Sequence, residues 1–177
     1  MTQGKLVIVK LPWMLSPSVS DLRVEVIENG DCVISAEVAV LPESAPLTNA
    51  LDNRRVSLTF AGGQWVRTHP YLGDHVIPPN LFEPPQKPWF DRLSVQRSLR
   101  QCRELWVSSG HCPNSRVYQV QNSSWIREQN AERYGCQHFV LQGHDIWVEL
   151  LAKSFRWRWS GASSAEVINT DELGKYF

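Results

Sequence analysis

Alternating runs of apolar and polar residues predict that β-strands dominate the N-terminal part of the chain. Residues 5–10, KLVIVK, form a short run rich in β-branched side chains, which is typical of a strand. Residues 23–41 contain two longer runs, RVEVIE and CVISAEVAVL, separated by Asn29-Gly30-Asp31. Asn-Gly between apolar runs indicates a tight turn, because a type I′ turn needs a positive φ at both central residues. We therefore predict a β-hairpin over 23–41.

A second pair of apolar runs follows the same logic. Residues 55–60 and 64–71 flank Gly62-Gly63, which is a turn signal, so the pattern predicts another hairpin at 55–71. Together these runs predict that residues 1–72 form an antiparallel β-meander of about five strands.

Proline then interrupts the pattern. Residues 73–89 hold five prolines: Pro78, Pro79, Pro84, Pro85 and Pro88. Proline fixes φ and has no backbone donor, so this segment suits neither a helix nor a central strand. We expect an extended linker over the surface, at the boundary between two subregions.

Two helices are expected after this linker. A helix over 91–108 would place Val95, Leu99, Cys102 and Trp106 on one narrow apolar stripe. A second helix is predicted over 125–134, with Ser123 or Ser124 as its N-cap and Gly135 just beyond its end.

The last part of the chain returns to strands. Residues 137–142 predict a strand, 143–145 a turn, and 146–160 a long final strand. Its first half, IWVELLA, is apolar on both faces, which suits a central strand. Its second half alternates strictly, with Phe155, Trp157 and Trp159 on one face and Arg156 and Arg158 on the other.

These elements predict an α+β fold that is mainly antiparallel β. An N-terminal meander, a Pro-rich crossover, two helices and a C-terminal β-hairpin would complete a curved sheet, a sandwich or a barrel. We expect a single globular domain over 1–161, formed by the meander (1–72), the linker (73–89) and an α/β part (90–161). Residues 162–177 would be a C-terminal tail.

Composition narrows the functional classes. Of the 177 residues 42% are hydrophobic and 20% charged, as in a globular protein. The formal net charge is zero, which argues against nucleic-acid binding, because such proteins usually carry a basic excess. The eight tryptophans indicate either a well-filled core or a binding surface.

The N-terminus lacks a basic start followed by a long apolar run, and no run is long enough for a membrane span. We therefore expect a cytoplasmic protein with reduced thiols and no membrane association.

Candidate metal and catalytic groups are sparse. His111, Cys112, Cys136 and His138 are a weak zinc candidate, because structural sites usually pair ligands two to four residues apart. We read them as ordinary thiols and histidines and expect no metal and no cofactor. Familiar nucleophile, zinc-protease and phosphate-loop motifs are missing, so the sequence favours a non-enzyme.

Glu149 is the residue that most needs an explanation, because a carboxylate in a central strand is costly unless it is paired. It would either face solvent or pair with an arginine. Alternatively, it would lie at the bottom of a ligand pocket lined by Trp147, Trp157 and Trp159.

A basic surface beside aromatic residues is a further possibility. Arg97, Arg100 and Arg103 share one flank of the first helix, and Arg156 and Arg158 lie on the final strand. Such a surface suits single-stranded nucleic acid, but three arginines on a helix are usually its solvated face. Trp89 closes the Pro-rich segment and would pin it to the domain or contribute to an interface.

The sequence therefore predicts a non-catalytic interaction protein that docks a macromolecular partner, of the inhibitor, immunity or assembly-factor type. The alternative is a β-barrel-like pocket protein that binds or transforms a small apolar ligand; nucleic-acid binding is less favoured. The candidate binding residues are Trp89, Arg97, Arg100, Arg103, Trp147, Glu149, Phe155, Arg156, Trp157, Arg158 and Trp159.

Overall fold

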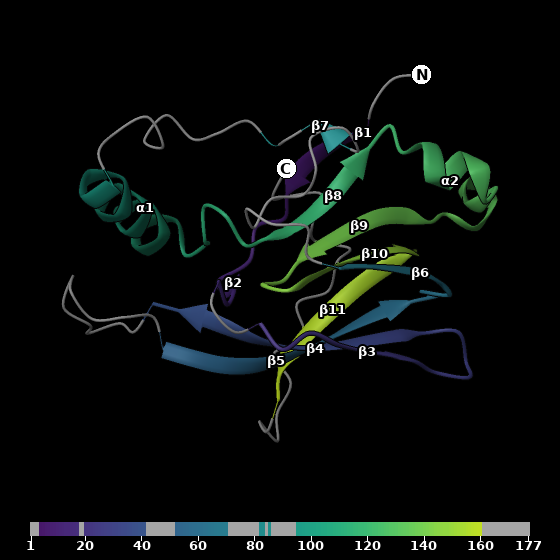
Figure 1. Cartoon of the computed structure of the whole chain (residues 1–177), viewed down its shortest axis with the longest axis horizontal. Helices are drawn as coiled ribbons and strands as arrows, with labels where there is room; N and C mark the ends of the chain where they lie inside the picture. Colours follow the sequence, from purple (N-terminus) through teal and green to yellow (C-terminus); the bar gives the residue numbers. More distant parts are fainter. Residues whose placement is uncertain are drawn as a thin grey trace.

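Two largely antiparallel β-sheets pack face to face over one apolar core (Figure 1). The structure, a computed structural model, describes residues 4–17, 20–41, 52–70, 82–83, 85 and 95–160. It confirms the predicted α+β class with mainly antiparallel strands and a curved sheet. None of the described helices is long and apolar enough to cross a membrane.

The larger sheet, sheet A, has six strands. Its order is β6 (Trp65–Pro70), β10 (Ile146–Ala152), β9 (Gln137–Gln142), β8 (Val117–Gln121), β1 (Gly4–Ile8) and β7 (Phe82–Glu83). Only the pairing of β1 with β7 is parallel among those described. The short strand β7 lies inside the predicted linker, most of which falls outside the described residues.

The smaller sheet, sheet B, lies beneath it. Its order is β11 (Ser154–Trp159), β5 (Asp52–Ala61), β4 (Cys32–Val40) and β2 (Met14–Leu15), and β3 (Arg23–Val26) also pairs with β4. The hairpin predicted over 23–41 is confirmed as β3–β4. Its turn is closed by the Ile27 N–H, which donates to the Asp31 carbonyl, with Gly30 at a φ of 89°.

The hairpin predicted over 55–71 is wrong. The chain does turn at Gly62-Gly63, but β5 belongs to sheet B and β6 to sheet A. The predicted single meander over 1–72 is therefore divided between the two sheets. Alternation identified the strands correctly, but it does not determine the neighbour with which each strand pairs.

The long final strand is also divided between the sheets. It runs as β10 in sheet A, bends at Lys153 and continues as β11 in sheet B. At the bend the Lys153 N–H donates to the Ala61 carbonyl at 2.9 Å, next to the turn that joins β5 to β6. Two neighbouring segments thus cross from one sheet to the other at the same corner, as in sandwiches whose strands turn by bends.

The core fills the space between the sheets with large side chains. The alternation predicted for β11 is confirmed, because Phe155 and Trp157 are buried while Arg156 and Arg158 are exposed. Trp157 meets the ring of Trp13 edge-on, with centroids 5.6 Å apart. The aromatic face of β11 is therefore part of the central core.

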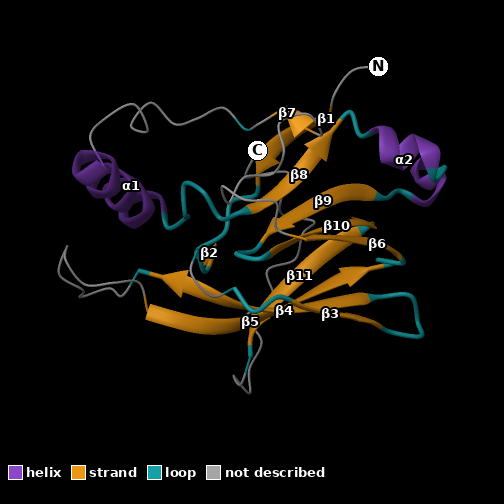
Figure 2. Ribbon diagram, viewed as in Figure 1, coloured by secondary structure: helices purple, strands orange, loops and turns teal. Residues whose placement is uncertain are grey.

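The two helices lie at opposite ends of sheet A in the view of Figure 2. The first, α1 (Val95–Ser109), buries Trp106, whose indole N–H donates to the Pro12 carbonyl, but leaves Leu99 66% exposed.

The second predicted helix is interrupted. Its first turns form α2 (Ser124–Glu128), capped by Ser123 as expected, and its end forms the 3₁₀-helix η2 (Ala131–Tyr134). Asn130 breaks it in a left-handed conformation, which asparagine tolerates better than most residues. The predicted division into a domain over 1–161 and a tail over 162–177 stays a prediction, since the tail lies outside the described residues.

We expect Trp157→Ala to lower the free energy of unfolding by about 3–5 kcal/mol, because it leaves a large cavity in a close-packed core. The neighbouring Arg158→Ala should change it by no more than about 0.5 kcal/mol, because that side chain is exposed. Denaturant-induced unfolding measures both values. Equal midpoints for the two variants would show that the aromatic face of β11 is not core.

Candidate functional site

The register of sheet A gathers a cluster of ionisable side chains on the face that points away from the core. Glu149 of β10 is paired with Arg67 of β6. His69 of β6 is paired with Trp147, and His138 of β9 with Leu151. Because side chains alternate along a strand, His69 and His138 lie diagonally on either side of Glu149 on one face, within reach of long side chains.

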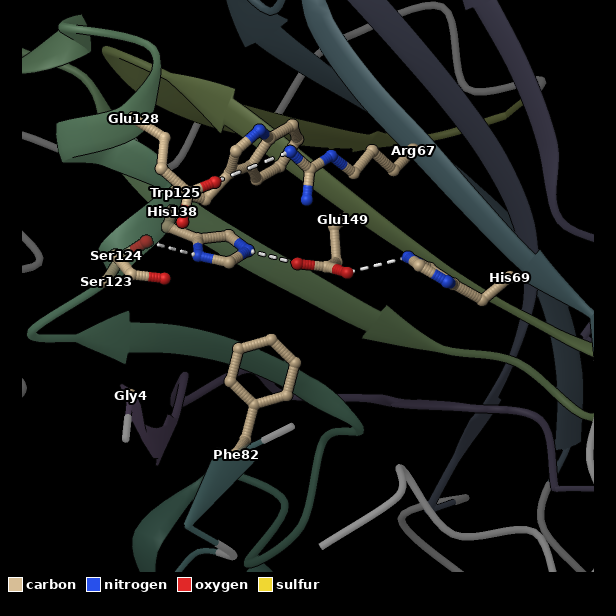
Figure 3. A pocket seen from close by; sticks show the side chains of 10 residues that line it. All are labelled: Gly4, Arg67, His69, Phe82, Ser123, Ser124, Trp125, Glu128, His138 and Glu149. Atoms are coloured by element: carbon tan, nitrogen blue, oxygen red, sulfur yellow. Dashed lines mark hydrogen bonds and ion pairs between the residues drawn. The ribbon is translucent and has the colours of Figure 1, made fainter. Parts of the chain in front are cut away.

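The two imidazoles hold the carboxylate from opposite sides (Figure 3). The Nε2 atom of His69 lies 2.7 Å from Glu149 Oε1, and the Nε2 atom of His138 lies 2.9 Å from Oε2. Neither contact has the angular geometry of a good hydrogen bond, so we describe both as close polar contacts. The Glu149 side chain is 7% exposed and that of His138 only 1%.

The pKa of the Glu149 carboxyl lies below its ordinary value. Burial acts to raise it, since desolvation disfavours the charged form. The attraction of His138, and then of His69, outweighs burial and lowers the pKa overall. The carboxylate is therefore held in its ionised form inside the protein.

His138 extends the cluster to a serine. Its Nδ1 atom lies 2.8 Å from the Oγ atom of Ser123, the N-cap of α2. The same Oγ accepts a hydrogen bond of 3.2 Å from the Ile126 N–H. Ser123, His138 and Glu149 thus form a continuous chain of polar contacts drawn from α2, β9 and β10.

A pocket of about 180 Å³ opens over this chain. It is lined by Gly4, Arg67, His69, Phe82, Ser123, Ser124, Trp125, Glu128, His138 and Glu149 (Figure 3). The rings of Phe82 and Trp125 both meet the ring of His138 edge-on, with centroids 5.7 and 5.2 Å away. Two aromatic side chains of the pocket lining therefore pack against His138.

Arg67 and Glu128 contribute opposite charges to the pocket wall. The Arg67 guanidinium lies 3.9 Å above the Trp125 ring and 4.0 Å from the Glu128 carboxylate. Their side chains are 43% and 53% exposed, so the pair adds little to stability.

The structure brings together only part of the predicted site. Glu149 lines the pocket, and Trp147 stacks on His69 with centroids 4.0 Å apart. The remaining residues lie elsewhere: Phe155, Trp157 and Trp159 pack on the core between the sheets, Arg156 and Arg158 are exposed on sheet B, Arg97, Arg100 and Arg103 are on α1, and Trp89 lies outside the described residues.

Sequence reasoning missed the partners of Glu149. His138 was considered only as a zinc ligand and Ser123 only as a cap, and His69 and Arg67 were not considered. The turn predicted at 143–145 would pair position 138 with 150 and place His138 on the face opposite to Glu149. In the structure the loop between the paired residues is one residue longer, so 138 pairs with 151 and His138 lies diagonal to Glu149. His69 had no local signal either, because β6 reaches β10 through a change of sheet.

The weak zinc candidate does not assemble. Within the described ranges no three His, Cys, Asp or Glu side chains are grouped so that they could hold a metal ion. The two ring nitrogens of His138 face Ser123 and Glu149, while Cys136 packs with Trp125 and Leu151.

Comparisons of the chain with protein families, with curated proteins and with solved structures gave no match. The function of this site must therefore be inferred from its chemistry.

We expect the ionised Glu149 to make the free energy of unfolding depend on pH. A folded pKa below the unfolded value of about 4.3 contributes stability above that pH, and the contribution is lost as the pH falls through the folded pKa. The difference in unfolding free energy between the wild type and Glu149→Gln should therefore be larger at about pH 6 than at about pH 3. A difference that stays constant across this range would show that the pKa is not lowered.

Proposed function

We propose that the protein binds a small molecule in the pocket over sheet A, with Glu149 as the group that recognises it. The observation that carries this proposal is an ionised carboxylate, only 7% exposed, in the wall of an open pocket. Replacing buried ionic groups by well-packed apolar ones is often neutral or stabilising. Stability alone is therefore a weak reason for this arrangement, which supports a binding role.

The pocket volume limits the size of the ligand. A cavity of about 150 Å³ accepts benzene, whereas pockets for drug-sized molecules occupy about 300–1,000 Å³. A volume of about 180 Å³ therefore suits a molecule of roughly one ring with a small substituent.

The lining residues indicate which polar groups the ligand presents to the pocket. Each Glu149 oxygen contacts one imidazole and keeps further capacity to accept a hydrogen bond. Phe82 and Trp125 offer apolar surfaces for a ring. The sequence led us to consider a purely apolar ligand, but a flat ring that bears an N–H or O–H donor fits these groups better.

Three probes of equal size and different charge test this proposal: benzamidine, benzamide and benzoate. Tryptophan fluorescence reports binding, because Trp125 forms part of the pocket wall. We expect benzamidine and benzamide to give saturable changes and benzoate, which lacks a donor, to give none. Glu149→Gln should weaken benzamidine binding at least about tenfold, equivalent to about 1.4 kcal/mol.

Glu25→Gln is the matched control, since Glu25 is an exposed carboxylate on β3 in sheet B. It should leave all three titrations unchanged. Equal binding of benzoate and benzamidine, or no saturable change with any probe, would contradict the proposal.

Our second proposal is the function that the sequence favours: the protein docks a protein partner. This docking would take place in the cytoplasm and would need no cofactor. The observation that favours it is helix α1, where Leu99 and Val107 are 66% and 67% exposed. These residues are eight positions apart and so share one face of the helix.

If a protein partner binds this face of α1, both the wild type and Glu149→Gln should capture it from an extract of the native host. The double variant Leu99→Glu/Val107→Glu should not capture it. A partner that is retained by the double variant would contradict docking on α1. Quantitative mass spectrometry of the captured material distinguishes these outcomes.

A further inference from the structure

The polar chain beside the pocket has the order of groups that activates a nucleophile. Glu149 Oε2 lies 2.9 Å from one ring nitrogen of His138, and the other ring nitrogen lies 2.8 Å from the hydroxyl oxygen of Ser123. A hydroxyl beside a base, with the base oriented by a third group, is the arrangement by which proteins turn serine into a nucleophile.

The protons of this chain can be placed from its donors and acceptors. In the neutral form that a general base requires, His138 keeps its proton on Nε2, which faces Glu149, because an ionised carboxylate only accepts. Nδ1 is then free to accept the proton of the Ser123 hydroxyl. The Ile126 N–H donates to the same oxygen, so the serine is fixed in place and its proton is directed at the base.

The two ring nitrogens have exchanged roles relative to the chymotrypsin-type arrangement, in which Nε2 faces the serine. The change does not alter the proton path, because either nitrogen of an imidazole can accept while the other donates. Glu149 stabilises the positive charge that the ring acquires, and His69 holds the second carboxylate oxygen as a positioning residue.

From this geometry we infer that Ser123 is a nucleophile that accepts the acyl group of a small ester bound in the pocket. The inference rests on the proposed function, because it requires the pocket to admit a small molecule. Ser123 is only 6% exposed, and it lines the pocket. Of the described lining residues, Arg67 alone has a permanent positive charge, which suits the oxyanion that develops during acyl transfer.

The reaction balances without a further reagent except water. Ser123 Oγ forms a bond to the ester carbonyl carbon, and its proton moves to His138 Nδ1. The bond to the leaving oxygen then breaks, and that oxygen departs as an alcohol with the proton from His138. Water attacks the acyl group through the same base, releases a carboxylic acid and restores the serine hydroxyl.

Phenylmethylsulfonyl fluoride tests the inference, because it has a single ring and modifies activated serines with loss of hydrogen fluoride. We expect intact-protein mass spectrometry to show one phenylmethylsulfonyl group on the wild type, and peptide mapping to place it on Ser123. His138→Gln should slow the labelling at least about 100-fold, the lower range for loss of a general base.

Two variants separate a reactive serine from a serine that only caps a helix. Ser123→Asn keeps a good N-cap but removes the nucleophile, so it should fold and should not be labelled. Ser108→Ala removes an exposed hydroxyl on α1, outside the pocket lining, and should be labelled at the wild-type rate. If Ser123→Asn does not fold, mapping of the label on the wild type still decides the question.

The outcomes distinguish this inference from the proposed function. An unlabelled wild type that binds benzamidine overturns the nucleophile and leaves the binding pocket intact. An unlabelled wild type that binds no probe overturns both. A label on any residue other than Ser123, or a label that persists in Ser123→Asn, also overturns the inference.

Discussion

The contact of the Glu149 carboxylate with two imidazoles organises the outer face of sheet A. A charge this deeply buried is tolerated only when opposing groups compensate for its lost hydration. His69 and His138 supply that compensation from the two strands that flank β10. Trp147 packs against the ring of His69, and Trp125 packs against the ring of His138. The carboxylate itself remains in the wall of the pocket, so this wall is both polar and charged.

The change of sheet at Lys153 explains why this cluster is separate from the core. Before the bend, the odd-numbered residues of β10 face outward, and Glu149 points into the pocket. After the bend, Phe155 and Trp157 of β11 face inward and pack between the sheets. One continuous stretch of sequence thus supplies the pocket with its central charge and the core with two of its largest side chains.

The sequence was a good guide to local structure and a poor one to pairing. Strict alternation in β11 predicted correctly which side chains are buried, and Asn29-Gly30 predicted the turn of β3–β4. The pairing of β6 with β10 was missed, because adjacent strands in sequence usually pair with each other and β5 and β6 do not. Glu149 was recognised as unusual, but its partners were hidden. His69 lies across this unexpected pairing, and His138 was weighed as a weak zinc ligand and read as an ordinary histidine.

The proposed activation of Ser123 depends most directly on where the proton of His138 lies. Nitrogen-15 NMR of histidine-labelled protein distinguishes a ring nitrogen that carries a proton from one that accepts a hydrogen bond. This mechanism predicts that the His138 ring has its proton on Nε2, facing Glu149, and an accepting Nδ1, facing Ser123. A proton on Nδ1 instead would contradict it, because the ring would then present an unprotonated nitrogen to an ionised carboxylate and could not accept the serine proton.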